Sequence, residues 1–336
     1  MMKLPRNRET MISAVSLLAI AVLGSLGCNT AELAEAPLAA AVTSADEKPE
    51  SPRTARTGVL LVSHGSHSPE WRKMLSDFHD SVEPQLLGLS GISGVKSAFM
   101  EYTEPSIATK LKEFDQEGYE DVILVPLLLT VSSHSFDDIP TIIGAKEDAK
   151  SLMTLQAQRI ERYTPQARVT IAPLLEFSSL LQENVPRRIA AFSQNPSREG
   201  VVLVAYGDEL YNEEWEAFFN RLDEVVRQKT GVAKVVHSWC GHIVRYSKDP
   251  TQDAIRQVLS QHDRAIVIPV LVARDRFFQE ELIGRAVEES NAGDRVAYVP
   301  DAILPDPKLN EWVLSIARET YTRLNSDDTL RQEQSR

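Results

Sequence analysis

The feature that most constrains the fold is an internal repeat of short apolar runs, each followed by a charged stretch with helical character. The run GVLLVSHG (58–65) matches GVVLVAYG (200–207). Further along, VPLLLTVSSHSFDDI (125–139) matches IPVLVARDRFFQEEL (268–282) without a gap. This ordered repetition predicts a gene duplication that produces two similar lobes with a cleft between them.

The repeated runs have the character of buried parallel strands. DVILVPLLLT (121–130) and RAIVIPVLVA (264–273) are apolar on both faces, which is typical of parallel strands covered on both sides by helices. The alternation of such runs with helical stretches predicts an α/β fold of two doubly wound parallel-sheet lobes. We expect strands at 58–63, 95–100, 121–130, 168–172, 200–205, 233–239, 264–273 and 295–299, and a helix closing each half near 180–192 and 309–324.

The first 28 residues have the pattern of an export signal. Three basic residues precede a short apolar run, MISAVSLLAIAVLGSLG (11–27), which ends at Cys28. A small residue directly before a cysteine resembles a bacterial lipoprotein signal. We therefore expect lipidation at Cys28 and an exported protein that is anchored on the periplasmic side of the membrane through its N-terminus only. A plain N-terminal anchor, or a signal cleaved without lipid, is the alternative.

The rest of the 336-residue chain divides by composition and by the repeat. Residues 29–56 are rich in Ala, Glu, Ser and Pro and lack apolar periodicity, which predicts a disordered linker. The repeat predicts a first lobe over 57–196 and a second, degenerate lobe over 197–326. A polar tail follows over 327–336.

Charge and cysteine content exclude several classes of function. The net charge is −12, with 36 basic and 48 acidic side chains, which argues against a nucleic-acid partner. The chain has two cysteines, so a disulfide scaffold is excluded. No run after the signal is long and apolar enough to span a bilayer. These features predict a globular body and leave its oligomeric state open.

Three potential metal ligands follow three successive strands of the first half. His64 follows the first strand, Glu101 comes at the end of the second, and His134 follows the third. Because the carboxyl ends of parallel strands meet at one edge of a sheet, we expect these side chains to lie close together. Singly, each residue would be a helix cap or a solvated loop residue. Jointly, two imidazoles and a carboxylate predict a site for a divalent first-row metal such as Co, Fe, Ni or Zn.

The loop after the first strand has defined turn chemistry. Gly65 permits a tight turn with positive φ. Ser68 and Pro69 fit the N-cap and first position of a helix, whose N-terminal N–H groups favour an anionic group nearby. His67 lies on the same loop, either as a fourth partner of the site or as a surface residue, and we favour the surface residue.

The second half lacks the three ligands. Aromatic residues stand at the equivalent positions: Tyr206 after its first strand, Phe277 after its third, and Tyr246 or a neighbour near the end of its second. We expect this lobe to supply shape and packing, together with one arginine for ligand carboxylates. The candidates for that arginine are Arg245, Arg274 and Arg276.

A second histidine- and cysteine-containing stretch, HSWCGH (237–242), follows a strand of the second half. His237, Cys240 and His242 could together bind a metal. However, side chains alternate along a strand, which puts His237 on the opposite face from Cys240 and His242. The spacing therefore favours a structural role.

Three motifs together resemble a known family. VSHGS, FMEYTEPSI and VPLLLTVSSHSFDDIP resemble the class II tetrapyrrole chelatases, in particular the sirohydrochlorin cobaltochelatases and ferrochelatases of the CbiX family. The resemblance is strong from Thr57 to about Pro140 and weaker through both lobes. It implies that His64, Glu101 and His134 surround the site where the metal enters, as ligands and catalytic groups. The sequence departs from the family at His67, where an arginine is usual.

The resemblance implies an enzyme that inserts a divalent metal, cobalt or ferrous iron, into a sirohydrochlorin-like tetrapyrrole. The metal would be a substrate, other divalent metals would also be possible, and no tightly bound cofactor is implied. Export is unusual for such an enzyme. It favours, as alternatives, an exported non-catalytic protein that binds a metal or a tetrapyrrole, or a relic of the fold without a site.

Overall fold

The computed structural model describes residues 55–175 and 179–334. The predicted signal, Cys28 and almost all of the predicted linker lie outside the described residues. Residues 52–336 form one compact unit. Within the described ranges, no helix has the length and apolar character needed to cross a membrane.

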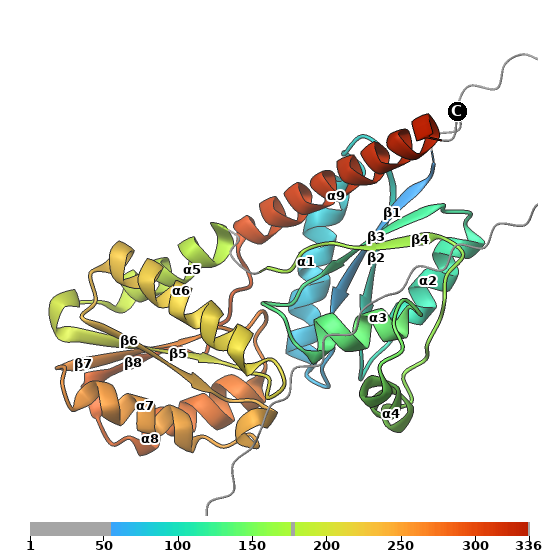
Figure 1. The fold of residues 1–336 in the computed structure, drawn as a ribbon. Helices are drawn as coiled ribbons and strands as arrows, with labels where there is room; N and C mark the ends of the chain where they lie inside the picture. Colours follow the sequence, from blue (N-terminus) through green and yellow to red (C-terminus); the bar gives the residue numbers. More distant parts are fainter. Residues whose placement is uncertain (1–54, 176–178, 335–336) are drawn as a thin grey trace, which may run out of the picture. The chain divides into compact units, whose positions relative to one another are not determined.

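Two four-stranded sheets, parallel throughout, form the body of this unit (Figure 1). The strand order is β2-β1-β3-β4 in the first sheet and β6-β5-β7-β8 in the second, so the two lobes repeat one topology. This confirms the predicted α/β fold with two parallel-sheet lobes. The strands are β1 (Thr57–Ser63), β2 (Ile92–Phe99), β3 (Asp121–Pro126), β4 (Arg168–Ile171), β5 (Glu199–Ala205), β6 (Lys234–Trp239), β7 (Arg264–Pro269) and β8 (Val296–Tyr298).

Helices cover both faces of each sheet (Figure 1). The α-helices are α1 (Pro69–Leu87), α2 (Ile107–Gln116), α3 (Ile139–Ile142), α4 (Ala149–Gln158), α5 (Ser179–Phe192), α6 (Asn212–Thr230), α7 (Asp249–Leu259), α8 (Arg285–Glu289) and α9 (Pro307–Gln334). Two π-helical turns are η1 (His134–Asp138) and η4 (Phe277–Gly284), and three 3₁₀ turns are η2 (Pro196–Arg198), η3 (His242–Val244) and η5 (Gly293–Arg295).

Two strands end earlier than predicted. β3 stops at Pro126 and β7 at Pro269, four residues before the end of each apolar run. The apolar residues that follow line a cavity instead of extending the sheet, among them Leu127–Leu129 and Leu271–Ala273. The sequence alone could not predict where these two strands end, because the wall of a cavity and a buried strand can have the same apolar side chains.

The closing helices are exchanged between the halves, which corrects our expectation that each would close its own half. α5 packs against α6 and β7 of the second lobe, whereas α9 packs against α1 and β3 of the first. Polar contacts accompany the exchange: the buried side-chain amide of Asn184 on α5 donates to Asp306, just before α9, at 2.8 Å. Asn310 on α9 likewise donates to Ser81 on α1 at 3.0 Å. Hydrophobic periodicity marks a helix but does not say which sheet it covers.

The exchange joins the two lobes through one hydrophobic core. The largest cluster of buried side chains contains Leu61 from β1, Leu203 from β5, Val185 from α5 and Val313 from α9. The opposite face of each sheet has a smaller core of its own, one against α2–α4 and one against α7–α8. The two lobes are therefore mechanically coupled, which keeps the edges of the two sheets in a fixed relation.

Replacing Leu203 with alanine should destabilise both lobes together. Leu203 is fully buried in the shared core, so its loss removes apolar contacts and leaves a cavity that costs about 2–5 kcal/mol of unfolding free energy. A single, earlier transition in denaturant would report this. Leu87→Ala is the matched control, because Leu87 is 45% exposed and should change stability by less than about 0.5 kcal/mol. Equal effects of the two substitutions would contradict the assignment of the core.

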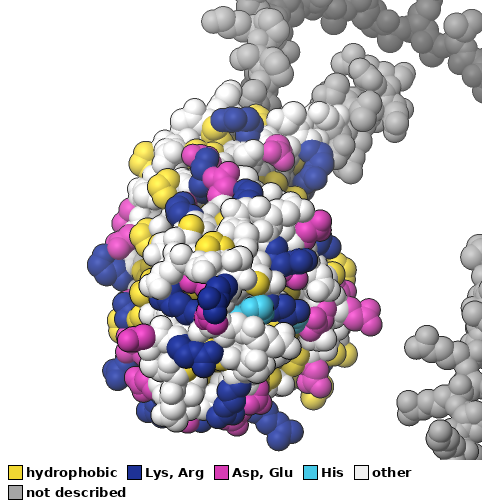
Figure 2. Space-filling view, turned by 90° about the vertical axis from the view of Figure 1, so that its left-hand side faces the viewer, with side chains coloured by type: hydrophobic (Ala, Val, Ile, Leu, Met, Phe, Trp, Pro, Cys, Tyr) yellow, Lys and Arg dark blue, Asp and Glu magenta, His cyan; other side chains and the backbone are white. Residues whose placement is uncertain are grey.

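The outer surface has mixed charge. Figure 2 shows one face, on which Lys and Arg side chains lie among Asp and Glu side chains and the hydrophobic side chains form only small patches. Arg198 and Asp263 form one such ion pair on the exterior, at 2.5 Å.

Candidate metal centre

The three predicted ligands meet at the carboxyl edge of the first sheet. Nε2 of His64 lies 3.1 Å from Oε1 of Glu101 and 3.2 Å from Nε2 of His134. One ligand atom from each residue lies within 4.8 Å of the others, and this is the one such group of three or more potential ligands found in the described part of the chain. Two atoms that bind one metal at about 2.1 Å are roughly 3–3.5 Å apart, so the spacing fits a shared ion.

The strand register explains why these residues converge. Val62 on β1 pairs with Ala98 on β2 and with Pro126 on β3, so the three strands end level with one another. His64 then follows β1 directly, and the backbone N–H of Glu101 donates to the carbonyl of His64 at 3.0 Å. The main chain itself therefore holds the first histidine beside the glutamate.

The predicted turn after His64 is confirmed. Gly65 adopts φ +109°, a conformation that favours glycine. The Ser68 hydroxyl accepts a hydrogen bond from the Trp71 N–H, and Pro69 occupies the first turn of α1. His67 is exposed, with its ring centroid 4.8 Å from that of Tyr102, and it is not part of the ligand group.

Both imidazoles present Nε2 to the site because their Nδ1 atoms are engaged. Nδ1 of His64 lies 2.9 Å from the carbonyl oxygen of Gly65, which can only accept a hydrogen bond. Nδ1 of His134 lies 2.8 Å from Oδ2 of Asp138. In each neutral ring the proton is therefore on Nδ1, and the lone pair of Nε2 is free to bind a metal.

Sequence reasoning missed Asp138, the carboxylate that orients His134. It lies four residues after His134 within the π-helical turn η1, and only 9% of its side chain is exposed. Its second oxygen accepts a hydrogen bond from the Ser151 hydroxyl at 2.5 Å. The spacing His-x-x-x-Asp on a helical turn was the available signal, because residues four apart lie on one helix face. Our interpretation instead considered only that His134, taken singly, could be a helix cap.

The surroundings of the three candidate ligands shift their pKa values in different directions. Burial, together with the neighbouring charge of His134, lowers the pKa of His64 to about 3. Burial also opposes charge on His134, but the hydrogen bond and the charge of Asp138 outweigh it and raise the pKa of His134 above its ordinary value. Burial raises the pKa of the Glu101 carboxyl. Near neutral pH, His64 is thus a neutral ligand beside a histidine that takes up a proton readily.

The second lobe offers aromatic groups where the first offers ligands. Tyr206 follows β5 as His64 follows β1, and their ring centroids lie 6.4 Å apart. The backbone hydrogen bond from Gly241 to Tyr206 repeats that from Glu101 to His64. Gly241 is therefore the counterpart of the glutamate, which corrects our assignment of Tyr246 or its neighbours to that position.

Tyr246 has a different role, in that its hydroxyl lies 3.0 Å from that of Tyr206. Phe277 begins η4 as His134 begins η1, as the alignment of the halves predicted. The second lobe thus places a pair of tyrosines and a phenylalanine opposite the metal ligands.

The HSWCGH stretch does not form a metal site. His237 lies on β6, where Nε2 is 3.1 Å from Glu216 and the ring stacks on Phe219. Cys240 is buried, which raises the pKa of its thiol to about 12. His242 lies beside Tyr206 instead, with ring centroids 5.4 Å apart. These contacts support the structural role that alternation along the strand predicted.

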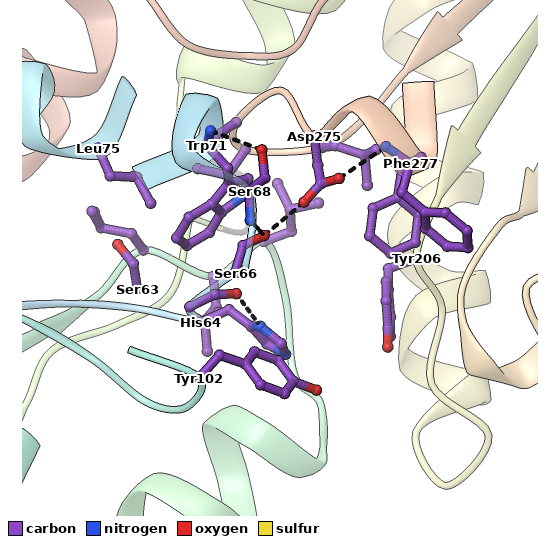
Figure 3. Close-up of a pocket in the computed structure, with 18 of the residues that line it drawn as sticks. Ser63, His64, Ser66, Ser68, Trp71, Leu75, Tyr102, Tyr206, Asp275 and Phe277 are labelled. Atoms are coloured by element: carbon purple, nitrogen blue, oxygen red, sulfur yellow. Dashed lines mark hydrogen bonds between the residues drawn. The ribbon is translucent and has the colours of Figure 1, made fainter. Parts of the chain in front are cut away.

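A cavity of about 910 Å³ opens in front of the ligands and is lined by residues of both lobes. Figure 3 shows His64 and Tyr102 on one side of it and Tyr206 and Phe277 on the other. A hydrogen bond of 2.7 Å from Ser66 to Asp275 links the two sides. This volume is at the upper end of the range for small-molecule sites, so a large planar ligand can approach the histidine pair.

Of the three candidate arginines, one lines this cavity. Arg276 lies in the cavity wall, and 73% of its side chain is exposed. Arg274 forms an ion pair with Glu70 at 3.0 Å instead, and Arg245 ends the turn η3 in a left-handed conformation. Neither of these two is among the cavity-lining residues.

Comparison with known proteins places these features in a family. The CbiX family model matches residues 58–192. The chain is 29% identical over 132 residues to the sirohydrochlorin cobaltochelatase of Saccharolobus solfataricus, covering 39% of this chain and 92% of the relative. It is 30% identical over 95 residues to that of Saccharolobus islandicus strain Y.G.57.14, covering 28% of this chain and 70% of the relative.

The fold is also that of solved chelatases. The sirohydrochlorin chelatase SirB from Bacillus subtilis subspecies spizizenii, in complex with cobalt, superimposes with a TM-score of 0.58 at 20% sequence identity. The match covers 79% of this chain and 95% of SirB. Sequence, topology and the His-Glu-His group agree, and the chain belongs to the CbiX family of metal chelatases.

Proposed function

We propose that this protein inserts divalent cobalt or ferrous iron into a sirohydrochlorin-like tetrapyrrole at His64, Glu101 and His134. The observation that carries the proposal is that both Nε2 atoms and the buried carboxylate of Glu101 gather together, and that the two histidines line a cavity of macrocycle size, in a chain of the chelatase family. Three protein ligands leave coordination positions open. The pyrrole nitrogens of a macrocycle can take these positions as the metal is handed over.

The reaction releases two protons for each metal inserted, because both pyrrole N–H groups must be deprotonated. We assign His64 as a metal ligand that stays neutral, in line with its pKa of about 3. Once the metal has left His134, Nε2 of that ring is free to accept one proton, and the imidazolium is stabilised by Asp138. Glu101, whose pKa is raised, can accept the other and pass it to solvent.

A multiple-turnover assay tests the proposal. Purified protein would be incubated without oxygen with Co²⁺ or Fe²⁺ and excess sirohydrochlorin or a dicarboxylic porphyrin, and the change in absorption on metal insertion would be followed. Many equivalents of metallated product per chain support the proposal. Binding of one equivalent without turnover would instead support the non-catalytic binding protein. If the folded protein bound neither metal nor macrocycle, the remaining interpretation would be a relic of the chelatase fold that has no functional site.

Replacing Asp138 with asparagine should weaken metal binding and shift its pH dependence. Protons compete with the metal for Nε2 of His134, so binding is lost as pH falls through the raised pKa of that histidine. Without the carboxylate the pKa of His134 falls, so the midpoint of metal loss moves to lower pH. At neutral pH the loss of orientation should reduce Co²⁺ affinity by about 10–100-fold. Titrations of Co²⁺ across a pH series measure both effects.

Asp137→Asn is the matched control for this variant. Asp137 is the adjacent carboxylate in η1, but its partners are Lys146 and the Tyr211 hydroxyl rather than His134. We expect its pH midpoint to equal that of the unmodified protein. A midpoint that moves equally in both variants, or in neither, would show that Asp138 does not set the proton affinity of His134.

We further propose that the chain is exported and is lipidated at Cys28. The sequence pattern of residues 1–28 supports this proposal. Mass spectrometry of the mature N-terminus tests it: a peptide that begins at a diacylglyceryl-modified Cys28 is expected. An unprocessed Met1 would contradict it.

A further inference from the structure

We propose that, among tetrapyrroles that could enter this cavity, the site prefers those with few ionised carboxylates over octacarboxylates such as sirohydrochlorin. This inference rests on the proposed function and concerns which tetrapyrrole the same site prefers. It follows from the charges and the apolar character of the cavity wall.

The charges that line the cavity are predominantly negative. Four carboxylate residues lie in the wall, and Arg276 is the one Lys or Arg side chain that lines it. A second arginine, Arg274, lies outside the lining and forms an ion pair with Glu70 at 3.0 Å. The carboxylates are Glu70, Asp208, Asp275 and Glu281. A ligand with eight peripheral carboxylates would place its negative charges against those of the wall, and this repulsion disfavours its binding.

Two of the carboxylates are held in place as anions. Asp208 accepts hydrogen bonds from the N–H and the hydroxyl of Ser133, at 2.9 and 2.6 Å. These bonds and two from backbone N–H groups outweigh burial and lower the pKa of Asp208. Asp275 accepts hydrogen bonds from the Ser66 hydroxyl and from the N–H of Phe277. Neither side chain can turn away from the wall without breaking contacts between the lobes.

The single arginine of the wall already has two acidic neighbours. Nε of Arg276 lies 3.5 Å from a carboxylate oxygen of Glu280 and 3.7 Å from one of Glu281. One arginine that shares two acidic partners can bind one ligand carboxylate but not a ring of eight.

The remaining wall is apolar and aromatic. Trp71, Leu75, Leu129 and Trp215 line its interior as parts of the shared core. Three of the eight large hydrophobic side chains exposed in the described chain lie at this cavity, namely Tyr102, Tyr246 and Phe277. Exposed apolar side chains gathered at one cavity mark a binding surface for an apolar ligand.

The aromatic groups also face the metal ligands in a way that suits a flat ring. Tyr206 and Phe277 lie across the cavity from His64 (Figure 3). A macrocycle with one face towards the histidines would have its other face against these rings, where stacking is favourable. The wall therefore favours a planar, apolar π-system with few charges at its edge.

Parallel insertion assays with three macrocycles test this inference. Co²⁺ insertion would be measured with a dicarboxylic porphyrin, mesoporphyrin, and with two octacarboxylates, uroporphyrin and sirohydrochlorin. We expect kcat/KM to be roughly tenfold or more higher for the dicarboxylate. An equal or higher value for either octacarboxylate would overturn the inference and leave the proposed function intact. Absence of insertion into all three would instead overturn the proposed function.

A measurement of macrocycle binding tests the inference even if the purified protein does not insert metal. Quenching of tryptophan fluorescence by each macrocycle reports occupation of the cavity, since Trp71 and Trp215 line it. Tighter binding of the dicarboxylate supports the inference even without insertion, and tighter binding of an octacarboxylate overturns it.

Charge reversal provides the matched pair of variants. Glu281→Lys should raise the ratio of octacarboxylate to dicarboxylate kcat/KM by severalfold, because it adds a cation to the wall and frees Arg276 from one partner. Glu147→Lys makes the same change in net charge at a residue whose side chain is 81% exposed and which does not line the cavity. Its ratio should stay that of the unmodified protein. Equal ratios in the two variants would show that the wall charges do not select the substrate.

Discussion

Replacing His64 with alanine is expected to abolish metal insertion, lowering kcat/KM by roughly 100-fold or more. The substitution removes Nε2 of His64, which lies within 3.2 Å of a ligand atom of both Glu101 and His134. The site therefore loses the side chain that contacts both others. His134→Ala should have an effect of similar size, because it removes both a ligand and the proposed proton acceptor. A spectrophotometric insertion assay with Co²⁺ and the preferred macrocycle measures both losses.

His262→Ala controls for the loss of an imidazole. His262 precedes β7, at the opposite edge of the second sheet from the ligand-binding edge, and it is not among the cavity-lining residues. This variant should insert metal at the rate of the unmodified protein. Circular dichroism and thermal unfolding would establish that all three variants are folded. Full activity of both His64→Ala and His134→Ala would refute the assignment of the site.

Replacing Gly65 with alanine is expected to be the most damaging small substitution in the chain. A Cβ atom on this residue would lie 1.9 Å from the carbonyl oxygen of Glu101, and φ of +109° is strained for any side chain. Relief requires the loop to move away from the end of β2, which separates His64 from Glu101. We expect a loss of about 3 kcal/mol or more of unfolding free energy together with loss of high-affinity Co²⁺ binding.

Gly118→Ala separates the backbone strain from the clash. Gly118 also has positive φ, +74°, but a Cβ atom there would meet nothing within 4 Å. Its substitution should cost about 1 kcal/mol and leave Co²⁺ binding unchanged. If denaturant unfolding gave equal costs for the two variants, the close packing of the His64 loop against Glu101 would be wrong.

The sequence was sufficient to predict the sheets and the convergence of the three candidate ligands, because both depend on local patterns. Runs that are apolar on both faces identify parallel strands, and parallel strands bring their carboxyl ends to one edge. His64, Glu101 and His134 could therefore be placed together without any knowledge of the loops. The repeat between the halves extended the same reasoning to Tyr206 and Phe277.

The features that the sequence did not reveal depend on contacts between distant segments. The exchange of α5 and α9 follows from packing across the whole unit, which helical periodicity does not encode. The wall charges of Asp208 and Asp275 are held by Ser133 and Ser66 from the other lobe. Asp138 is the exception: its spacing from His134 was visible, but a carboxylate at a helix start has several ordinary explanations.

X-ray absorption spectroscopy of the Co²⁺-loaded protein tests the central claim most directly. Before macrocycle is added, we predict a cobalt ion bound by two imidazole nitrogens and a carboxylate oxygen, with water at the open positions. After addition, the spectrum should change to that of cobalt in a square of four pyrrole nitrogens, with loss of the original histidine signals as product forms. Cobalt without histidine ligands at the start, or cobalt whose ligands do not change when the macrocycle is added, would contradict the account.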